Sequence, residues 1–289
     1  MKIKILIPVY NDWQSLFKLI DEIDKLQINE EFQISILIIN DASNHDRATE
    51  KKQFKNIHSI KILNMIKNQG HARCIATGLK YLFEKNDFDY IIPMDGDGED
   101  RPEEIRDFLN KIKNSNDKAI VGERVKRSEN LKFKVCYFLH KLFTFAFTGQ
   151  LIKFGNFTCL PKLIVSKMIN EKATWNSFSG SLKKIEKDLE TIPSIRGKRY
   201  FGPSQMSFYN LIKHSLSIIS VFRKTFLIRS ALFIILYILL IKSNASIITA
   251  IPIIFLLVAV YSISNLSLRE NMDEFKNSLK LIKNIDIIQ

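Results

Sequence analysis

Asp95-Gly96-Asp97-Gly98-Glu99 decides the fold, because these three carboxylates follow directly on the apolar run Tyr90-Ile91-Ile92-Pro93-Met94. The run predicts a buried strand. Arg101-Pro102-Glu103-Glu104-Ile105 then predicts a helix start, with proline near the first helical position. In an extended chain alternate residues point the same way, so the carboxylates would share one face at the end of the strand. An acidic turn without a function would have the same composition. Whether this stretch is functional therefore depends on what the rest of the chain places beside it.

The three carboxylates also suggest a ligand. Hard oxygen donors suit Mg²⁺ or Mn²⁺ bridging a diphosphate, whereas Zn²⁺ would prefer histidine or cysteine. The two interposed glycines let the backbone bend and approach a ligand closely. The sequence therefore predicts a metal site at Asp95, Asp97 and Glu99.

Size and charge limit the possible functions. The chain has 289 residues and a formal net charge of +13, which fits an anionic membrane surface, a phosphorylated substrate or nucleic acid. Nucleic acid is disfavoured because many basic residues flank apolar, membrane-like runs. The three cysteines, Cys74, Cys136 and Cys159, are widely spaced and indicate a reducing compartment. The apolar run that ends at Pro8 is too short for a signal peptide and predicts a strand.

Apolar runs alternate with helical patterns over the first 121 residues. This alternation predicts an α/β fold with a mostly parallel sheet and helices on both faces. The expected strands are Ile3–Pro8, Ile34–Ile39, Ile60–Leu63, Tyr90–Met94 and Ala119–Val121. The expected helices are Trp13–Leu26, Gly70–Phe83, Pro102–Asn114 and, further on, the aromatic-rich Phe133–Phe147.

Polar groups gather where the strands end. Tyr10-Asn11-Asp12, Asn40-Asp41 and the acidic stretch each follow a predicted strand. Ligands of parallel sheets bind at the carboxyl ends of strands, so these groups are expected to form one site. No G-x-G-x-x-G follows the first strand, which argues against a dinucleotide.

Residues Ser207–Thr225 form a basic amphipathic pattern directly before an apolar stretch. Such a helix fits one lying on a membrane surface, although an ordinary core-facing helix has the same pattern. Two apolar runs follow, Phe226–Ile241 and Ile247–Ile263, each near the lower limit of about 17 residues for a bilayer span. They predict a transmembrane hairpin, with a buried core hairpin as the alternative.

Basic residues predict the orientation of that hairpin. They are dense before the first run and after the second, whereas the connecting loop carries only Lys242. By the positive-inside rule both ends and the catalytic part face the cytoplasm. The expected organisation is a catalytic domain over residues 1–206, an amphipathic helix over 207–225, two membrane helices over 226–264 and a cytoplasmic tail over 265–289.

Individual residues suit a nucleotide ligand. Tyr10 could stack on a base and Asp41 could accept a base N–H, while Arg124, Lys126 and Arg127 could meet a phosphate. Each has a plainer alternative: Tyr10 could only pack, Asp41 could only cap a turn, and the basic trio could be a solvated face.

The sequence resembles the family 2 glycosyltransferases with a GT-A fold, and within them the dolichol- and bactoprenol-phosphate sugar transferases. The order and spacing of motifs match from residue 4 to about residue 207, and the C-terminal helix pair resembles the bactoprenol branch. The matching segments are Pro8-Val9-Tyr10-Asn11-Asp12, Asn40-Asp41-Ala42-Ser43, Asn68-Gln69-Gly70-His71-Ala72-Arg73, Asp95–Glu104, Gly122-Glu123-Arg124, Gly155-Asn156-Phe157 and Arg199–Ser204.

The resemblance implies roles for residues of this chain. Pro8, Tyr10 and Asp12 would contact the nucleoside, and Asp41 the base. Asp95 would serve both donor and metal, with Asp97 and Glu99 completing the metal set. The resemblance also implies a catalytic set and an acceptor-phosphate set, namely Asp97, Arg124 and Arg199, and Arg124, Lys126, Arg127 and Ser204.

The sequence departs from the family pattern at several positions. Glu99 stands where the family usually has Gln, and Asn40 replaces the first Asp of an acidic pair. Thr158 and Gln205 replace basic residues on the acceptor side, which leaves the acceptor less well defined than the donor chemistry.

The acceptor is expected to be a lipid phosphate. Transfer to a hydroxyl needs a general base, and no T-E-D motif follows Asn156, although Asp188 or Glu190 could serve. A phosphate is already an anion and needs cationic stabilisation instead. The expected activity is inverting transfer from a nucleotide-diphosphate sugar, such as a UDP-sugar, to polyprenyl (undecaprenyl) phosphate at the cytoplasmic face of the inner membrane.

Two alternative functions also fit the sequence. One is a family 2 transferase acting on another lipid or envelope-glycan acceptor, and the other is a non-catalytic, membrane-anchored nucleotide-sugar binder. The expected cofactor is Mg²⁺ or Mn²⁺. The expected partners are the donor, the lipid phosphate, the membrane and a possible second copy of the chain, but no nucleic acid.

Overall fold

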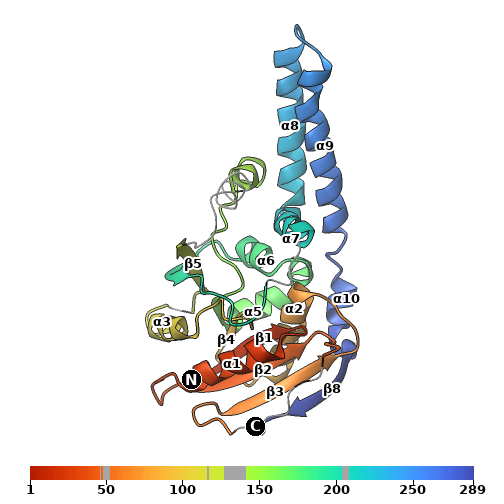
Figure 1. Cartoon of the computed structure of the whole chain (residues 1–289). Coiled ribbons are helices and arrows are strands. Elements are labelled where there is room, and N and C mark those ends of the chain that lie inside the picture. The colour runs from red at the N-terminus through yellow and green to blue at the C-terminus, as the bar shows by residue number, and fades with distance from the viewer. Residues whose placement is uncertain (46, 48–52, 116, 127–140, 204–207) are drawn as a thin grey trace.

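A computed structural model describes residues 1–45, 47, 53–115, 117–126, 141–203 and 208–289. One eight-stranded sheet carries helices on both faces, and a pair of long helices projects from it (Figure 1). The strand order is β7-β5-β6-β4-β1-β2-β3-β8. This arrangement confirms the predicted α/β fold with a mostly parallel sheet.

The centre of the sheet is parallel. It consists of β1 (Lys2–Val9), β2 (Gln33–Asn40), β3 (Ser59–Met65) and β4 (Tyr90–Pro93). β1 lies between β2 and β4, and β2 pairs with β3. These strands are covered on both faces, which explains their nearly continuous apolar sequences.

Three further strands extend the sheet beyond β4. They are β5 (Ile120–Lys126), β6 (Thr158–Pro161) and β7 (Glu190–Ile195). β6 is antiparallel to both β4 and β5, so β5 and its parallel partner β7 run in the same direction as β4. The sequence did not predict β6, a four-residue strand too short to show a period.

The helices divide between the two faces. α1 (Trp13–Asp24), η1 (Pro102–Glu104) and α3 (Ile105–Ile112) cover the face to which Ile5 and Ile7 point. The other face, on the side of Leu6, is covered by α2 (His71–Lys85), α5 (Lys162–Ile169) and α6 (Phe178–Ile185), with η2 (Lys172–Trp175) between the last two. Residues 141–148 are also helical, and the earlier part of the expected helix Phe133–Phe147 lies outside the described residues.

The projecting helices are α8 (Arg223–Ile241) and α9 (Ile247–Ser267), and both are long and apolar enough to cross a membrane. Only 11% of the most apolar window of each is buried inside the protein. Leu240 is 81% exposed and Ile247 is 88% exposed. The alternative of a hairpin buried in a protein core is therefore wrong, and the apolar surface is available to lipid.

α7 (Phe208–Ser220) precedes the hairpin and has two different halves. Ile219 and Ser217 are buried near its end, where the helix packs against α6 and α9. Tyr209 and Ile212 are exposed in its first half. The buried end of α7 matches the core-facing alternative, whereas the membrane-surface role of its exposed first half stays a prediction.

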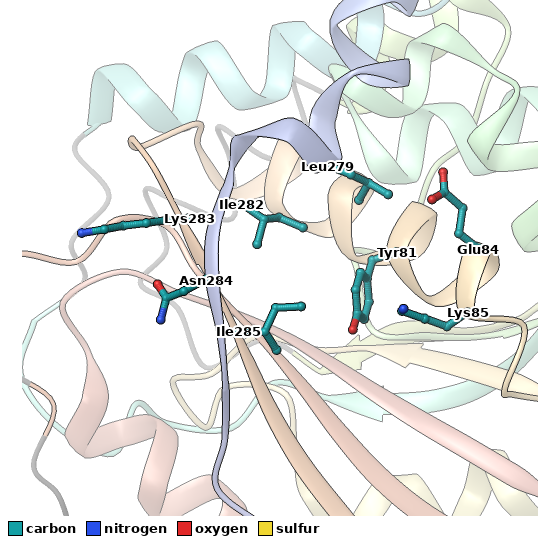
Figure 2. A pocket seen from close by; sticks show the side chains of 8 residues that line it. All are labelled: Tyr81, Glu84, Lys85, Leu279, Ile282, Lys283, Asn284 and Ile285. Carbon is teal, nitrogen blue, oxygen red and sulfur yellow. The ribbon is translucent and has the colours of Figure 1, made fainter.

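After the hairpin the chain returns to the sheet. It forms α10 (Met272–Lys276), η3 (Ser278–Leu281) and β8 (Ile282–Ile287), and β8 pairs antiparallel with β3. The segment expected to be a tail thus supplies an edge strand of the sheet. β8 and η3 also border α2 across an open groove of about 470 Å³, lined by Tyr81, Lys85 and Ile285 among others (Figure 2).

α10 fixes this return to the catalytic fold. Phe275 is 1% exposed and stacks on Trp175, with their ring centroids 5.5 Å apart. The Trp175 indole donates a hydrogen bond to Glu274 (2.9 Å), which also pairs with Arg73 of α2 (3.1 Å). The Arg73 guanidinium lies 4.9 Å from the centre of the Trp175 ring. Aromatic and ionic contacts therefore join the end of the hairpin to α2.

We predict that Phe275→Ala destabilises the whole protein. A fully buried phenylalanine truncated to alanine costs about 3–5 kcal/mol. The matched control is Ile287→Ala on β8, where the side chain is 72% exposed and the expected cost is below about 0.5 kcal/mol. Thermal unfolding of the full chain in detergent measures both. Equal midpoints would show that α10 is not fixed to the fold.

Candidate functional site

The polar groups expected at the strand ends do lie along one edge of the sheet. Val9 is in register with Asn40, and Leu6 with Pro93, so the residues after β1, β2 and β4 emerge side by side. Asp12, Asp41 and Asp95 come from these three exits. The parallel topology therefore assembles the site from segments far apart in the sequence.

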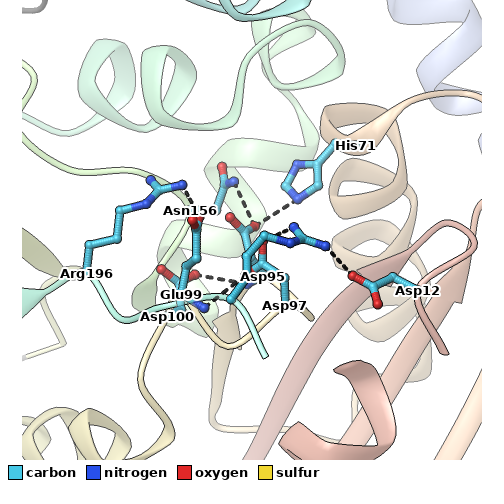
Figure 3. A network of polar contacts seen from close by, with 9 residues as sticks. Asp12, His71, Asp95, Asp97, Glu99, Asp100, Asn156 and Arg196 are labelled. Atoms are coloured by element: carbon cyan, nitrogen blue, oxygen red, sulfur yellow. Dashed lines mark hydrogen bonds and ion pairs between the residues drawn. The ribbon is translucent and has the colours of Figure 1, made fainter. Parts of the chain in front are cut away.

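The acidic stretch is a turn, not the extended chain that the sequence suggested. Gly98 has φ +87°, which bends the backbone between Asp97 and Glu99. As a result, the three carboxylates diverge toward different partners (Figure 3).

Each carboxylate of the turn contacts a cationic or potentially cationic group. Asp95 Oδ1 lies 2.9 Å from His71 Nε2, and Asp97 Oδ2 accepts a 2.7 Å hydrogen bond from Arg199. Glu99 pairs with Arg196. These contacts offset the mutual repulsion of carboxylates packed into five residues.

Arg199 also connects two strand exits. One guanidinium nitrogen bonds Asp97 and the other pairs with Asp12, which precedes α1. Its remaining donor, Nε, is buried without a hydrogen-bond partner among the described residues. Arg199 thus bridges the acidic turn and the predicted nucleoside loop.

A fourth carboxylate, that of Asp100, is buried and stabilises the turn. Asp100 is 8% exposed and accepts a 2.9 Å hydrogen bond from the backbone N–H of Asp95. Burial and the neighbouring Asp95 raise the pKa of Asp100. No role was predicted for this residue from the sequence, although it lies directly after the acidic pentapeptide.

Proton affinities differ across the turn. Burial and Asp95 raise the pKa of Asp97 to about 6. Burial acts in the same direction on Asp95, but His71 and Arg124 outweigh it and hold the pKa of Asp95 well below its usual range. Of Asp95, Asp97 and Asp100, Asp95 is therefore the one that most strongly retains its charge.

The donor atoms suit a hard divalent cation, because Asp95, Asp97 and Glu99 offer only carboxylate oxygens. Among the residues that the structure describes, no three His, Cys, Asp or Glu side chains converge on one point as a preformed ligand set. Instead, a histidine or an arginine faces each carboxylate. The set fits Mg²⁺ or Mn²⁺ in chemistry, with ion pairs holding the carboxylates in place.

Asp41 has a structural role beside the one expected. It is 4% exposed, and its two oxygens accept hydrogen bonds from the backbone N–H groups of Gln69 (2.6 Å) and Gly70 (2.9 Å). It therefore fixes the start of α2 against the end of β2. Tyr10 is 46% exposed nearby, and an exposed ring is available for stacking.

The expected phosphate-binding residues lie on and after β5. The Arg124 guanidinium lies against Gly155, where an added Cβ would come within 2.7 Å of it. Lys126 ends β5, and nothing is described of its side chain. Arg127 and Ser204 lie outside the described residues.

The two carboxylates considered as general bases lie elsewhere. Glu190 begins β7 and pairs with Lys111 (2.9 Å), and Asp188 pairs with Lys118 (2.6 Å). Because β7 runs parallel to β5, its first residue is at the edge of the sheet opposite the site. Their position removes both as candidates.

Besides Asp100, three further site residues were missed from the sequence. His71, Arg196 and Asn156, which donates to Asp95 at 3.4 Å, complete the surroundings of the turn. His71 could have been suspected because it follows Gly70 where a strand exit leads into a helix. Arg196 is brought in by a loop whose pairing with the turn no local pattern reveals.

The fold belongs to the GT-A class of glycosyltransferases. A mannosyltransferase from Pyrobaculum calidifontis, solved with GDP-Man and Mn²⁺, matches 91% of this chain and 73% of its own at a TM-score of 0.52 and 11% identity. Glucosyl-3-phosphoglycerate synthase from Mycobacterium tuberculosis, solved with Mn²⁺ and UDP, matches 78% of this chain and 79% of its own, at a TM-score of 0.54 and 11% identity.

The sequence model described as "Glycosyl transferase family 2" matches residues 4–162, more than half of the chain. The chain therefore belongs to glycosyl transferase family 2.

Two curated relatives are sugar transferases named for polyprenyl phosphates. Undecaprenyl-phosphate 4-deoxy-4-formamido-L-arabinose transferase of Klebsiella pneumoniae is 28% identical over 73% of this chain and 64% of its own length. Dolichol-phosphate mannosyltransferase of Pyrococcus furiosus is 29% identical over 46% of this chain and 37% of its own. The chain thus spans less than two thirds of these curated relatives.

We predict that Gly98→Ala disrupts the turn. A Cβ at this position would lie 2.5 Å from the Tyr200 ring, and φ +87° adds a backbone cost of about 1–2 kcal/mol. Gly202→Ala is the control, since φ is +64° there but nothing lies within 4 Å of the added atom. Thermal unfolding should show the larger loss for Gly98→Ala. Equal losses would mean that Tyr200 does not pack on the turn.

Proposed function

We propose that the protein transfers a sugar from a nucleotide-diphosphate donor, such as a UDP-sugar, to polyprenyl phosphate, with inversion at the anomeric carbon. The ion-paired acidic turn at the carboxyl edge of the sheet carries this proposal. It combines carboxylates for a divalent cation with Arg124, Arg196 and Arg199, which suit phosphate groups. Membership of family 2 supports the same reaction class.

The reaction needs little proton transfer from the protein. An oxygen of the acceptor phosphate, already anionic, attacks the anomeric carbon as the bond to the donor diphosphate breaks. The nucleoside diphosphate leaves with the bonding electron pair. When bound by Asp95 and Asp97, Mg²⁺ or Mn²⁺ would neutralise charge on the diphosphate. Arg124 and Arg199 would hold and stabilise the phosphates.

The exposed hairpin supports a lipid acceptor. α8 and α9 present apolar side chains outward, and the chain enters and leaves the hairpin at the catalytic fold. A lipid phosphate in the same bilayer would reach the site by lateral diffusion. The two relatives named for undecaprenyl phosphate and dolichol phosphate support this class of acceptor.

The same fold could serve another lipid or envelope-glycan acceptor, or only bind a nucleotide sugar. We predict that the full chain in nanodiscs labels undecaprenyl phosphate from one of the radiolabelled UDP- or GDP-sugars, and that EDTA stops the reaction until Mg²⁺ or Mn²⁺ is restored. No lipid product with any common donor would contradict the acceptor assignment.

Asp97→Asn separates catalysis from binding. It removes a charge from the turn, and we predict a loss of transfer of about a hundredfold or more. Asp107→Asn, an exposed carboxylate on α3, is the matched control and should leave transfer unchanged. Cellular function retained in Asp97→Asn would favour the non-catalytic alternative.

Orientation is tested by cysteine labelling. Ser243→Cys lies between α8 and α9, and Lys283→Cys lies on β8; both positions are exposed. With Cys136 replaced by Ser, a membrane-impermeant maleimide should label position 243 in intact cells and position 283 only after lysis. The reverse pattern would contradict a catalytic domain on the cytoplasmic face.

A further inference from the structure

Side-chain hydrogen bonds connect β8 to the loop after β2. Asn64 Nδ2 donates to Asp286 Oδ2 (3.0 Å), and Asn40 Nδ2 donates to Asn64 Oδ1 (2.8 Å). Asn40 Oδ1 then accepts the backbone N–H of Ser43 (3.0 Å). A carboxylate on the last strand thus reaches the loop at the predicted donor site through two amides.

We call this series of hydrogen bonds, from Asp286 through Asn64 and Asn40 to Ser43, the relay. The carboxylate of Asp286 at one end fixes which group of each amide donates and which accepts. A carboxylate only accepts hydrogen bonds, so Asp286 requires the NH₂ group of Asn64 to face it. The carbonyl oxygen of Asn64 must then face Asn40, and it selects the NH₂ group of Asn40. The Asn40 carbonyl oxygen then faces the backbone N–H of Ser43. This orientation is the required one, because that N–H is a donor and needs an acceptor.

Strand register places the three side chains together. Asn40 is the direct partner of Asn64 on the parallel strands β2 and β3. Asp286 is in register with Ile62, so it lies diagonally from Asn64 on the same face. Arg47 also pairs with Asp286 (3.1 Å), and that carboxylate is 36% exposed.

The relay ends at the loop 41–45, which has a strained backbone and lies at the predicted donor site. Ala42 has φ +57°, a left-handed conformation that costs a non-glycine residue about 1–2 kcal/mol and needs support from its surroundings. Ser43 Oγ accepts the backbone N–H of Asn11, and Asn11 Oδ1 accepts those of Asn44 and His45. The loop is thereby joined to the segment that carries Tyr10 and Asp12.

We propose that Asp286 is a positioning residue for the donor nucleoside, acting through Asn64 and Asn40 on the loop 41–45. The inference rests on the proposed function, because it takes this edge of the sheet as the donor site. It also explains why asparagine stands at position 40. With Asp286 at one end of the relay, a second carboxylate at the other would place an acceptor against an acceptor.

The relay predicts a reversal of effects on nucleotide binding. In Asn40→Asp the new carboxylate meets Asn64 Oδ1, and rotating Asn64 only moves the clash to Asp286. In Asn40→Asp with Asp286→Asn the carboxylate has moved to the other end, and every donor among residues 40, 64 and 286 again faces an acceptor. Only Arg47, which pairs with the same Asp286 oxygen as Asn64, loses its acceptor there. The loss of the Arg47 pair, whose side chains are 30% and 36% exposed, should matter little.

The test measures binding of UDP and of GDP, in MgCl₂, to the full chain in nanodiscs, by calorimetry. We expect Asn40→Asp to weaken the tighter of the two by about tenfold or more, and the double variant to return to within about threefold of the parent. Asp286→Asn alone should change affinity by less than about threefold, because its carbonyl oxygen can still accept from Asn64. Lys283→Ala, exposed on the same strand, should have no effect.

The outcomes distinguish this inference from the proposed function. Additive losses in the double variant, or an Asn40→Asp protein that binds as tightly as the parent, would overturn the relay. Recovery seen only in the unfolding midpoint, with nucleotide affinity unchanged throughout, would show a purely structural network and overturn the positioning role. A folded parent that binds neither nucleotide would overturn the proposed function itself, and with it the role of Asp286 toward a donor.

Discussion

The site depends on the neutralisation of carboxylates crowded at the end of one strand. Four acidic side chains lie within residues 95–100, and unopposed they would repel one another at a partly buried edge. His71, Arg196 and Arg199 come from two other parts of the chain and each takes one of them. The same ion pairs hold α2, the loop after β7 and the entry to α1 around the turn. The contacts that neutralise the carboxylates are therefore also contacts that hold these segments together.

The sheet places this charge-balanced turn on the same fold that carries the exposed apolar hairpin. Its parallel centre delivers three strand exits to one edge, while the hairpin leaves the fold after α7 and rejoins it through α10. The contact between Trp175 and Phe275 joins the end of the hairpin to α2, the helix that begins with His71. The exposed apolar helices α8 and α9 and the charged groups of the acidic turn are therefore both attached to α2.

The sequence was sufficient where one period or one motif dominated. The apolar runs of β1 to β4 could mean only buried strands, and the order of the motifs pointed to the GT-A fold. It was insufficient where distant segments decide the outcome. Asp95, Asp97 and Glu99 were expected on one face, but pairing with residues 196–200 and the positive φ of Gly98 turn them apart. β8 was missed because its six residues, which follow the apolar hairpin, carry no local sign that they pair with the edge of β3.

That late strand has a consequence for how the chain is made. β3 and β8 meet although more than two hundred residues separate them, so the edge of the sheet closes only after the hairpin has been synthesised. Until then β3 presents an unpaired edge, which is prone to aggregation. Cutting the chain before α8 would leave that edge open permanently. A soluble form for crystallisation would instead replace the hairpin with a flexible linker and keep α10 and β8.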